Sequence, residues 1–398
     1  MNEISQIAPV QFDTPVVPLV DVFVSDRDSE GVVRQCLAGA GFAARFTNGT
    51  IEDAIGELAR GGSPRLLIVD VSGVDDPTAR VRQLADVCDP STGVIVIGET
   101  NDIRFYRDLR DSGVVEYFFK PLVASLVARS CNEVLSGVAE HRGARLGKLV
   151  TVMSVRGGSG ATTIAAALAW HLAETLQRRT MLLDLDLHFG DLALLVDAVP
   201  THALIEALAQ PDRVDDLFLH RGVIQVTQRL GMLASLEPCD DPTLPDEAAV
   251  LPLLDKLLAR FRYVLIDLPA PLAARLPRVL HLPGTCLLVS DASLAAARDV
   301  GRWRQIIGAD TPDRTTLHIL NKSGAFGSLS QEDFTRAAGQ APDIVVPFDR
   351  EAGRAASLGI QTVSDTAALQ KGLAPVLRVL TGEQEAAPAS LLARIFGR

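Results

Sequence analysis

Short apolar runs alternate with stretches of helical periodicity through the first third of the chain. The runs predict strands at 20–26, 42–48, 65–71, 93–100 and 115–121. Helices are predicted between them near 29–40, 50–61, 77–87 and 103–112, with a further helix after Pro121. Successive β/α units with short connections predict a doubly wound parallel sheet.

A second series of apolar runs fills the rest of the chain and predicts strands at 149–155, 180–187, 263–269, 285–291, 316–322 and 343–348. Such near-continuous apolar strands are typical of parallel sheets covered on both faces. The polar, basic segment EHRGARLGK (140–148) predicts a linker. The predicted fold class is α/β, with two doubly wound parallel-sheet domains in series at 18–139 and 149–382. A disordered lead-in (1–17) and a polar tail (383–398) complete the organisation.

Composition narrows the classes of function. The 398 residues carry a formal net charge of −11, which disfavours broad nucleic-acid binding because that needs a basic surface. The five cysteines include no CxxC pair, so neither disulfides nor a zinc site is expected. No apolar run reaches the ~18 residues of a membrane span, and the N-terminus lacks the basic flank of a signal peptide. We therefore expect a cytoplasmic protein.

The segment with most chemical content joins the strand at 149–155 to a helix rich in alanine and leucine. It reads Arg156-Gly157-Gly158-Ser159-Gly160-Ala161-Thr162-Thr163. Three glycines in so short a loop let successive backbone N–H groups turn toward phosphate oxygens, and the helix N-terminus adds positive potential. A plain glycine turn is the alternative. The two threonines and the motifs further along the chain favour a phosphate cradle.

This loop is similar to the deviant Walker A loop of the MinD/ParA family, K-G-G-x-G-K-T-T. Both family lysines are replaced, the first by Arg156 and the P-loop lysine by Ala161. Arginine keeps a charge that can bind phosphate. Alanine removes a charge directed at the β/γ-phosphates, and loss of one preorganised donor typically costs on the order of 3 kcal/mol. We expect ATP and Mg²⁺ binding to survive weakly and hydrolysis to be slow or absent, with Arg156 and Lys148 the nearest substitutes for the lost lysine.

Other polar residues support the same resemblance. Asp184 and Asp186 end a strand where the family has a DxD switch, whose second aspartate orients the attacking water. Asp267 stands at the Walker B position, which holds Mg²⁺ through a water, while Thr162 would be the P-loop ligand to the metal. Asn321 stands where the family reads adenine. Taken alone, an aspartate at a strand end is more often a cap or turn residue. The order and spacing of these residues favour the functional interpretation.

The first domain resembles a response-regulator receiver. Asp70 ends its third strand at the phosphoacceptor position, Lys120 precedes Pro121 at the end of the fifth, and Asp26 follows the first. Three features depart from that pattern: Ser25 replaces an expected acidic residue, Gly98 replaces the usual hydroxyl residue, and no proline turn follows Asp70. A phosphoryl site needs carboxylates that bind Mg²⁺ and a hydroxyl that signals occupancy. The departures favour a pseudo-receiver docking module over a phosphorylated regulator.

A degenerate receiver followed by a MinD/ParA-like domain resembles the CpaE/TadZ family of pilus-assembly proteins over roughly residues 15–380. This resemblance implies a homodimer, formed through the ATPase domain, that places or assembles the Tad/Flp pilus secretion machinery, often at a cell pole. The tail PASLLARIFGR (388–398) has one apolar helical face, which predicts either weak membrane contact or docking on a protein. Alternative functions are a working ATPase with a dimer switch and a phosphorylation-controlled regulator. DNA partitioning is the least favoured.

Overall fold

The computed structural model describes residues 19–60, 62–136, 146–355, 359–360, 364 and 366–381. The chain divides into two compact units, Met1–Ala144 and Arg145–Arg398, so the division falls inside the segment 140–148. The predicted lead-in and tail lie outside the described residues. Lys148, which we placed in the linker, is instead the first residue of a strand, because it pairs with Tyr263 in the sheet of the second unit.

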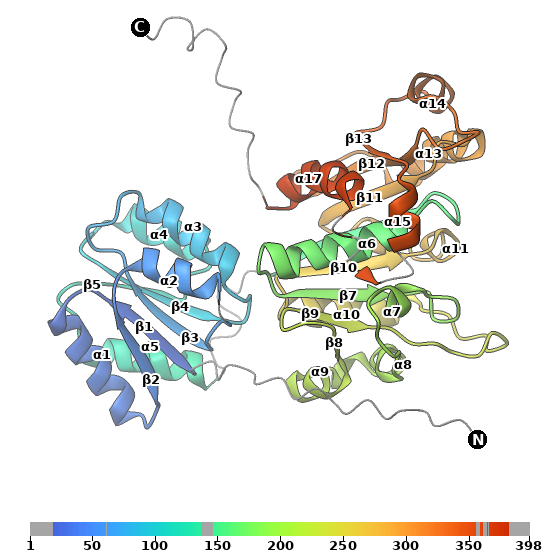
Figure 1. Ribbon diagram of the computed structural model, residues 1–398. Helices are drawn as coiled ribbons and strands as arrows, with labels where there is room; N and C mark the ends of the chain where they lie inside the picture. The colour runs from blue at the N-terminus through green and yellow to red at the C-terminus, as the bar shows by residue number, and fades with distance from the viewer. Residues whose placement is uncertain are drawn as a thin grey trace, which may run out of the picture. The chain divides into compact units, whose positions relative to one another are not determined.

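Unit 1 is built on a five-stranded parallel sheet in the order β2-β1-β3-β4-β5. Its strands are β1 (Val20–Val24), β2 (Ala44–Asn48), β3 (Leu66–Asp70), β4 (Gly93–Gly98) and β5 (Glu116–Phe119). Its helices are α1 (Arg27–Gly39), α2 (Ile51–Leu58), α3 (Pro77–Val87), α4 (Ile103–Asp111) and α5 (Ala124–Leu135). Side chains of α2, α3 and α4 share a core on one face of the sheet, while α1 and α5 cover the other (Figure 1).

Unit 2 contains an eight-stranded sheet in the order β13-β12-β11-β6-β10-β7-β9-β8. The strands are β6 (Lys148–Ser154), β7 (Thr180–Asp184), β8 (Ile224–Gln225), β9 (Leu230–Leu233), β10 (Tyr263–Leu268), β11 (Gly284–Ser290), β12 (Arg314–Ser323) and β13 (Ile344–Pro347). The predicted parallel sheet is confirmed, and one antiparallel pair extends it at an edge, where β8 pairs with β9. These two strands are short and join through a tight connection, so they lack the long apolar runs that predicted the others.

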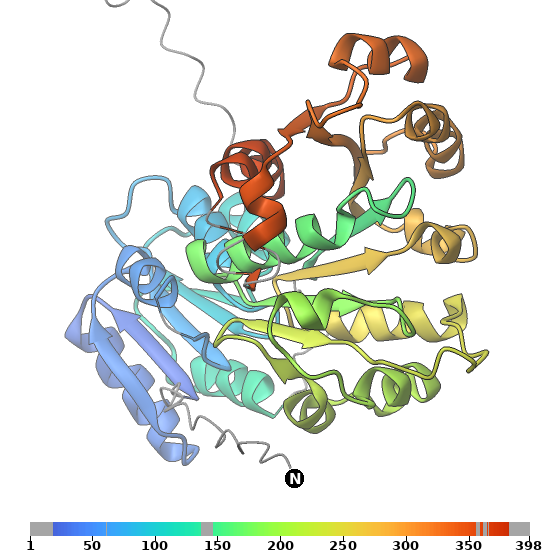
Figure 2. The same ribbon diagram turned by 45° about the vertical axis from the view of Figure 1, so that its right-hand side comes forward.

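Helices cover both faces of this sheet (Figures 1 and 2). One core contains side chains of α6 (Ala161–Trp170), α7 (Leu192–Leu195) and α17 (Ala367–Thr381), with the short π-helix η1 (His171–Thr175) continuing α6. The opposite core includes α8 (Ala203–Ala209), α9 (Asp216–Gly222), α10 (Glu247–Leu258), α11 (Ala270–Ala273), α12 (Pro277–Leu280), α13 (Leu294–Ile307) and α14 (Gln331–Ala338). A 3₁₀ turn, η2 (Pro211–Arg213), contacts α8 and α10, and α15 (Arg350–Ala355) follows β13. No helix in the described part of the chain has the length and apolar character of a membrane span.

The strand order places the glycine loop between the other predicted motifs. The loop follows β6, which lies between β10 and β11. Asp267 in β10 is paired in register with Asp184 in β7, and β12 lies beyond β11. Because parallel strands end at one edge of the sheet, the loop, both aspartates and the end of β12 gather there, at the position where open α/β sheets bind ligands.

Candidate functional site

The glycine loop adopts a conformation that depends on its glycines. Gly158 and Gly160 have φ values of +83° and +91°, a region that residues with a Cβ rarely occupy. Gly160 is the N-cap of α6, and a Cβ there would lie 2.5 Å from Nδ2 of Asn321. Around Gly157 and Gly158 a Cβ would meet nothing within 4 Å, so space remains beside the loop. This geometry suits a phosphate cradle formed by backbone N–H groups.

Ala161 begins α6 and is only 4 % exposed, packed in the core beneath the helix. The position that carries the P-loop lysine in the family therefore contributes no charge here. Lys148 cannot replace it, because Lys148 starts β6 whereas the loop follows the last residue of that seven-residue strand. Its Nζ donates to the Leu380 carbonyl. The expectation that Lys148 is a nearby substitute is wrong.

Arg156 is held by a carboxylate of its own chain. Its Nη1 donates to Oδ2 of Asp299 at 2.6 Å, and Arg298 and Arg302 also contact that carboxylate. Hydrogen bonds from Arg298, followed by those from Arg156 and Arg302, hold the pKa of Asp299 well below its usual range. Asp299 was not predicted as a site residue, since an aspartate among arginines on a helix predicts only ordinary surface pairs.

The predicted carboxylates meet at the ends of β7 and β10. Asp184 and Asp267 are 2 % and 7 % exposed, and the Thr162 hydroxyl hydrogen-bonds to Asp267. Asp186 lies in the loop that follows β7, and its backbone N–H donates to Oδ1 of Asp184 at 3.0 Å. A Cβ on Gly190 would lie 2.3 Å from Oδ2 of Asp184, so the loop closes tightly over this carboxylate.

Burial and mutual repulsion disfavour the charged forms of these aspartates. Desolvation, with the charge of Asp267 as a further cause, raises the pKa of Asp184 to about 8. Desolvation, together with the nearby Asp186 and Asp191, raises the pKa of Asp267 to about 6. A bound cation would relieve this repulsion. No group of three His, Cys, Asp or Glu residues in the described part of the chain could hold a metal alone.

Asn321 and its neighbour Lys322 contact the glycine loop from β12. Asn321 is 8 % exposed, and its Nδ2 donates to the Ser159 carbonyl at 2.8 Å. The Lys322 Nζ donates to the Gly158 carbonyl at 2.6 Å. Asn321 is therefore at the loop, with its donor used by the protein. Lys322 was missed, although it adjoins a predicted residue and carries the kind of charge that the loop has lost.

Unit 1 brings together all three receiver-like residues. The Lys120 Nζ lies 2.7 Å from Asp70 and 2.6 Å from Asp26, and Asp70 is fully buried. The Ser25 hydroxyl donates to Oδ2 of Asp70 at 2.5 Å, while the Ser72 backbone N–H donates to Oδ1 at 2.9 Å. Burial alone would raise the pKa of Asp70, but hydrogen bonds from Lys120, Ser25 and Ser72 outweigh it and the pKa is lowered.

The receiver hydroxyl position is filled differently. A Cβ on Gly98 would lie 2.9 Å from both the Tyr117 hydroxyl and Val71 Cγ2. Tyr117 is nearly buried, and its hydroxyl donates to the Thr100 carbonyl at 2.8 Å. A serine or threonine at position 98 would displace this ring. The space in which a hydroxyl would meet a phosphoryl group is thus taken by packing.

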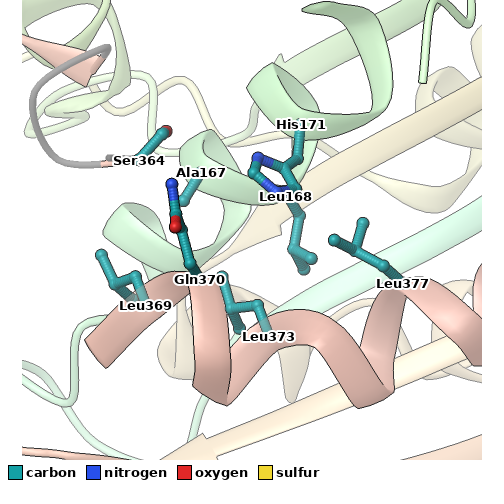
Figure 3. Close-up of a pocket in the computed structure, with 8 residues that line it drawn as sticks. All are labelled: Ala167, Leu168, His171, Ser364, Leu369, Gln370, Leu373 and Leu377. Carbon is teal, nitrogen blue, oxygen red and sulfur yellow. The ribbon is translucent and has the colours of Figure 1, made fainter. Parts of the chain in front are cut away.

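A small pocket in unit 2 lies between α6–η1 and α17 (Figure 3). His171 and Gln370 are the larger polar side chains at its wall, and the remainder of the lining is mostly apolar. Its residues are Ala167, Leu168, His171, Ser364, Leu369, Gln370, Leu373 and Leu377. None of them belongs to the predicted site, so this pocket is separate from the glycine loop.

Comparison with known proteins agrees with this geometry. Residues 147–298 match the family described as cellulose biosynthesis protein BcsQ. An uncharacterized ATP-binding protein of Methanocaldococcus jannaschii is 26 % identical over 212 residues, which are 52 % of this chain and 77 % of that protein. The family match lies within unit 2 and includes the glycine loop.

Two solved structures are similar to parts of this chain. A ParA family ATPase from Chlorobium tepidum TLS is similar with a TM-score of 0.50 and 20 % identity, over 57 % of this chain and 96 % of that one. The pilus assembly protein CpaE from Caulobacter crescentus CB15 is 29 % identical over 29 % of this chain and 97 % of that one, with a TM-score of 0.28. The first similarity establishes the P-loop fold of unit 2.

Proposed function

We propose that this protein is an ATP-binding dimeric scaffold of the CpaE/TadZ type, which positions or assembles Tad/Flp pilus secretion machinery with weak or no ATP hydrolysis. The observation that carries the proposal is the selective loss at Ala161. The left-handed glycines, Thr162 and the buried carboxylates Asp184 and Asp267 all retain an arrangement suited to Mg²⁺ and phosphate. A site that had lost its function altogether would not be expected to keep them.

The residues at the loop have distinct parts in this proposal. Backbone N–H groups of Gly157 to Thr162 would bind the phosphates, and the Thr162 hydroxyl and Asp267 would hold Mg²⁺. The ion would supply positive charge that offsets the charge of the phosphates. In this proposal Asp186 orients the attacking water. Without a lysine at position 161, charge that develops on the phosphate during hydrolysis is poorly stabilised. ATP is therefore bound but hydrolysed slowly or not at all.

In the proposed dimer, Arg156 would have to reach a phosphate bound to the second copy. In the described chain its guanidinium is occupied by Asp299, at 2.6 Å. Reaching a phosphate on a second copy would require exchange of that carboxylate for a phosphate oxygen, and guanidinium binds either one in a bidentate manner. The dimer is accordingly expected to depend on nucleotide.

The pilus role comes from the sequence resemblance, namely the pseudo-receiver followed by a ParA/MinD-like unit with a substituted loop. We place the protein in the cytoplasm, at a cell pole or peripheral to the inner membrane, with pilus machinery proteins as partners and no nucleic acid. Weak membrane contact is assigned to the tail. Flotation of the full chain with anionic vesicles, compared with a chain ending at Ala387, tests that assignment.

One experiment tests the central proposal directly. ATP affinity and turnover are measured for the wild type and for Ala161→Lys. We expect the wild type to bind ATP and hydrolyse it slowly, and the variant to hydrolyse it roughly 10²–10³ times faster. If the wild type hydrolyses ATP at a rate that Ala161→Lys does not raise, the missing lysine at position 161 does not limit hydrolysis. That result would favour a working ATPase with a dimer switch, for which the intact Thr162–Asp267 pair is the supporting observation.

A further inference from the structure

Two carbonyl groups of the glycine loop accept hydrogen bonds from consecutive residues of β12. Lys322 binds the Gly158 carbonyl, and Asn321 binds the Ser159 carbonyl. In a regular strand, successive side chains point to opposite faces and could not reach one loop. Here the register of β12 with β13 shifts between Leu320 and Ser323, and Lys322 has φ +57°. The irregularity directs both side chains to the loop.

The backbone of Lys322 is itself unusual. Among described non-glycine residues, positive φ occurs at Lys322 and at Asp76, Gln177 and Asp197. Such conformations are unfavourable for residues with a Cβ, and they persist where the surrounding structure requires them, commonly at functional sites. At Lys322 the requirement is visible, since the turn delivers its ammonium group to the loop.

No carboxylate in the described part of the chain neutralises the charge of Lys322. Arg156 is paired with Asp299, and Ala161 carries no charge. Within the described ranges no acidic side chain forms an ion pair with Lys322, whose nearest polar contact is the neutral Gly158 carbonyl. Its Cε would be 3.7 Å from a Cβ on Gly160, so the stem of the side chain lies along the loop. A positive charge thus remains beside the phosphate cradle.

We propose that Lys322 is a positioning residue that takes over part of the task lost at Ala161. It fixes the loop from its carbonyl side, so that the N–H groups face the phosphates, and it adds positive potential at the cradle. This inference rests on the proposed function, because it concerns the phosphates of a bound nucleotide. The ligand class it predicts is a nucleoside di- or triphosphate, bound more tightly as the phosphate charge increases.

The test compares binding of Mg-ATP, Mg-ADP and adenosine by the full chain using calorimetry. Lys322→Met should weaken Mg-ATP binding roughly tenfold or more, as expected for loss of a charge-assisted contact. Adenosine affinity should change by less than about twofold. Lys322→Arg should keep most of the Mg-ATP affinity. Lys371→Met, at an exposed lysine of α17, serves as the matched control and should leave all three affinities unchanged.

Two further measurements separate a charge effect from general damage. Adding Ala161→Lys to Lys322→Met should restore Mg-ATP affinity if the two lysines serve the same purpose. Hydrogen exchange of amides 157–161 without nucleotide should be faster in Lys322→Met than in the wild type, while β10 remains protected. The exchange measurement needs no bound ligand, so it detects a weakened loop in the nucleotide-free protein.

The outcomes distinguish this inference from the function it builds on. If the wild type binds Mg-ATP and Lys322→Met binds it equally well, the role of Lys322 is overturned while the proposed ATP binding is retained. An equal loss of Mg-ATP and adenosine affinity, or no rescue by Lys322→Arg, also overturns it, because a phosphate-directed charge would predict neither. Absence of ATP binding by the wild type overturns both proposals.

Discussion

Replacing Lys120 by methionine should destabilise unit 1 selectively. The ammonium group lies between two carboxylates, at 2.7 Å from Asp70 and 2.6 Å from Asp26. Asp70 is fully buried, whereas the Asp26 side chain is 38 % exposed. Methionine retains most of the apolar stem of lysine but removes the charge. The buried carboxylate of Asp70 is then left with neutral donors only.

The expected magnitude follows from this burial. Removing one partner of a buried ion pair typically costs 3–5 kcal/mol, because an uncompensated charge remains. Ser25 and Ser72 still donate to Asp70, so we expect the lower end, about 3 kcal/mol. For a domain of this size that lowers Tm by roughly 10–20 °C. Lys120→Met combined with Asp70→Asn should recover most of the loss, since no buried charge remains.

The loss of stability in Lys120→Met should depend on pH, in a direction set by the pKa of Asp70. In the wild type the pKa of Asp70 is lowered, so the stability it contributes is present above pH 3.8 and is lost as the pH falls below that value. In Lys120→Met we expect burial to outweigh the remaining hydrogen bonds from Ser25 and Ser72, so that the pKa of Asp70 is raised. Folding of the variant then weakens as the pH rises, so the deficit relative to the wild type should be larger at pH 7.5 than at pH 4.5.

The chain supplies its own control for the assay. Both tryptophans, Trp170 and Trp303, belong to unit 2, so tryptophan fluorescence follows unit 2 alone. Unit 1 is followed by hydrogen exchange in β1 and β3 during denaturation. Lys120→Met should shift the unit 1 transition and leave the fluorescence transition in place. A loss below about 1 kcal/mol that is equal at both pH values would show that Lys120 does not compensate a buried charge.

Two further predictions concern the ligand sites. Because the pKa of Asp184 is raised to about 8 and that of Asp267 to about 6, binding of Mg-ATP near pH 7 should release roughly one proton and should strengthen from pH 6 to pH 8. Calorimetry in buffers of different ionisation enthalpy measures the proton release, which Asp184→Asn should diminish. An affinity independent of pH would contradict the assignment of these carboxylates to the site. Acetyl phosphate with Mg²⁺ should not label Asp70, because its carboxylate is buried and fully hydrogen-bonded and Gly98 leaves no hydroxyl; phosphorylation detected at Asp70 by mass spectrometry would instead support a regulated receiver.

Much of the fold could be predicted from local sequence. Continuous apolar runs located the long strands, since a strand covered on both faces must be apolar throughout. The glycine spacing identified the loop, because left-handed backbone at Gly158 and Gly160 strongly favours glycine. The short β8–β9 pair was missed, as a two-residue strand carries too little hydrophobic pattern to be recognised.

The sequence by itself thus determined the two α/β series, the loop between β6 and α6, and the absence of a lysine at position 161. Only the tertiary structure decided where the remaining charges go: Arg156 to Asp299, Lys148 to Leu380, Lys322 to Gly158, and Lys120 between Asp26 and Asp70. Burial and backbone preference act on neighbouring residues and leave a pattern in the chain. The partner of a long polar side chain depends instead on which distant strands end side by side, and on a single irregular residue such as Lys322.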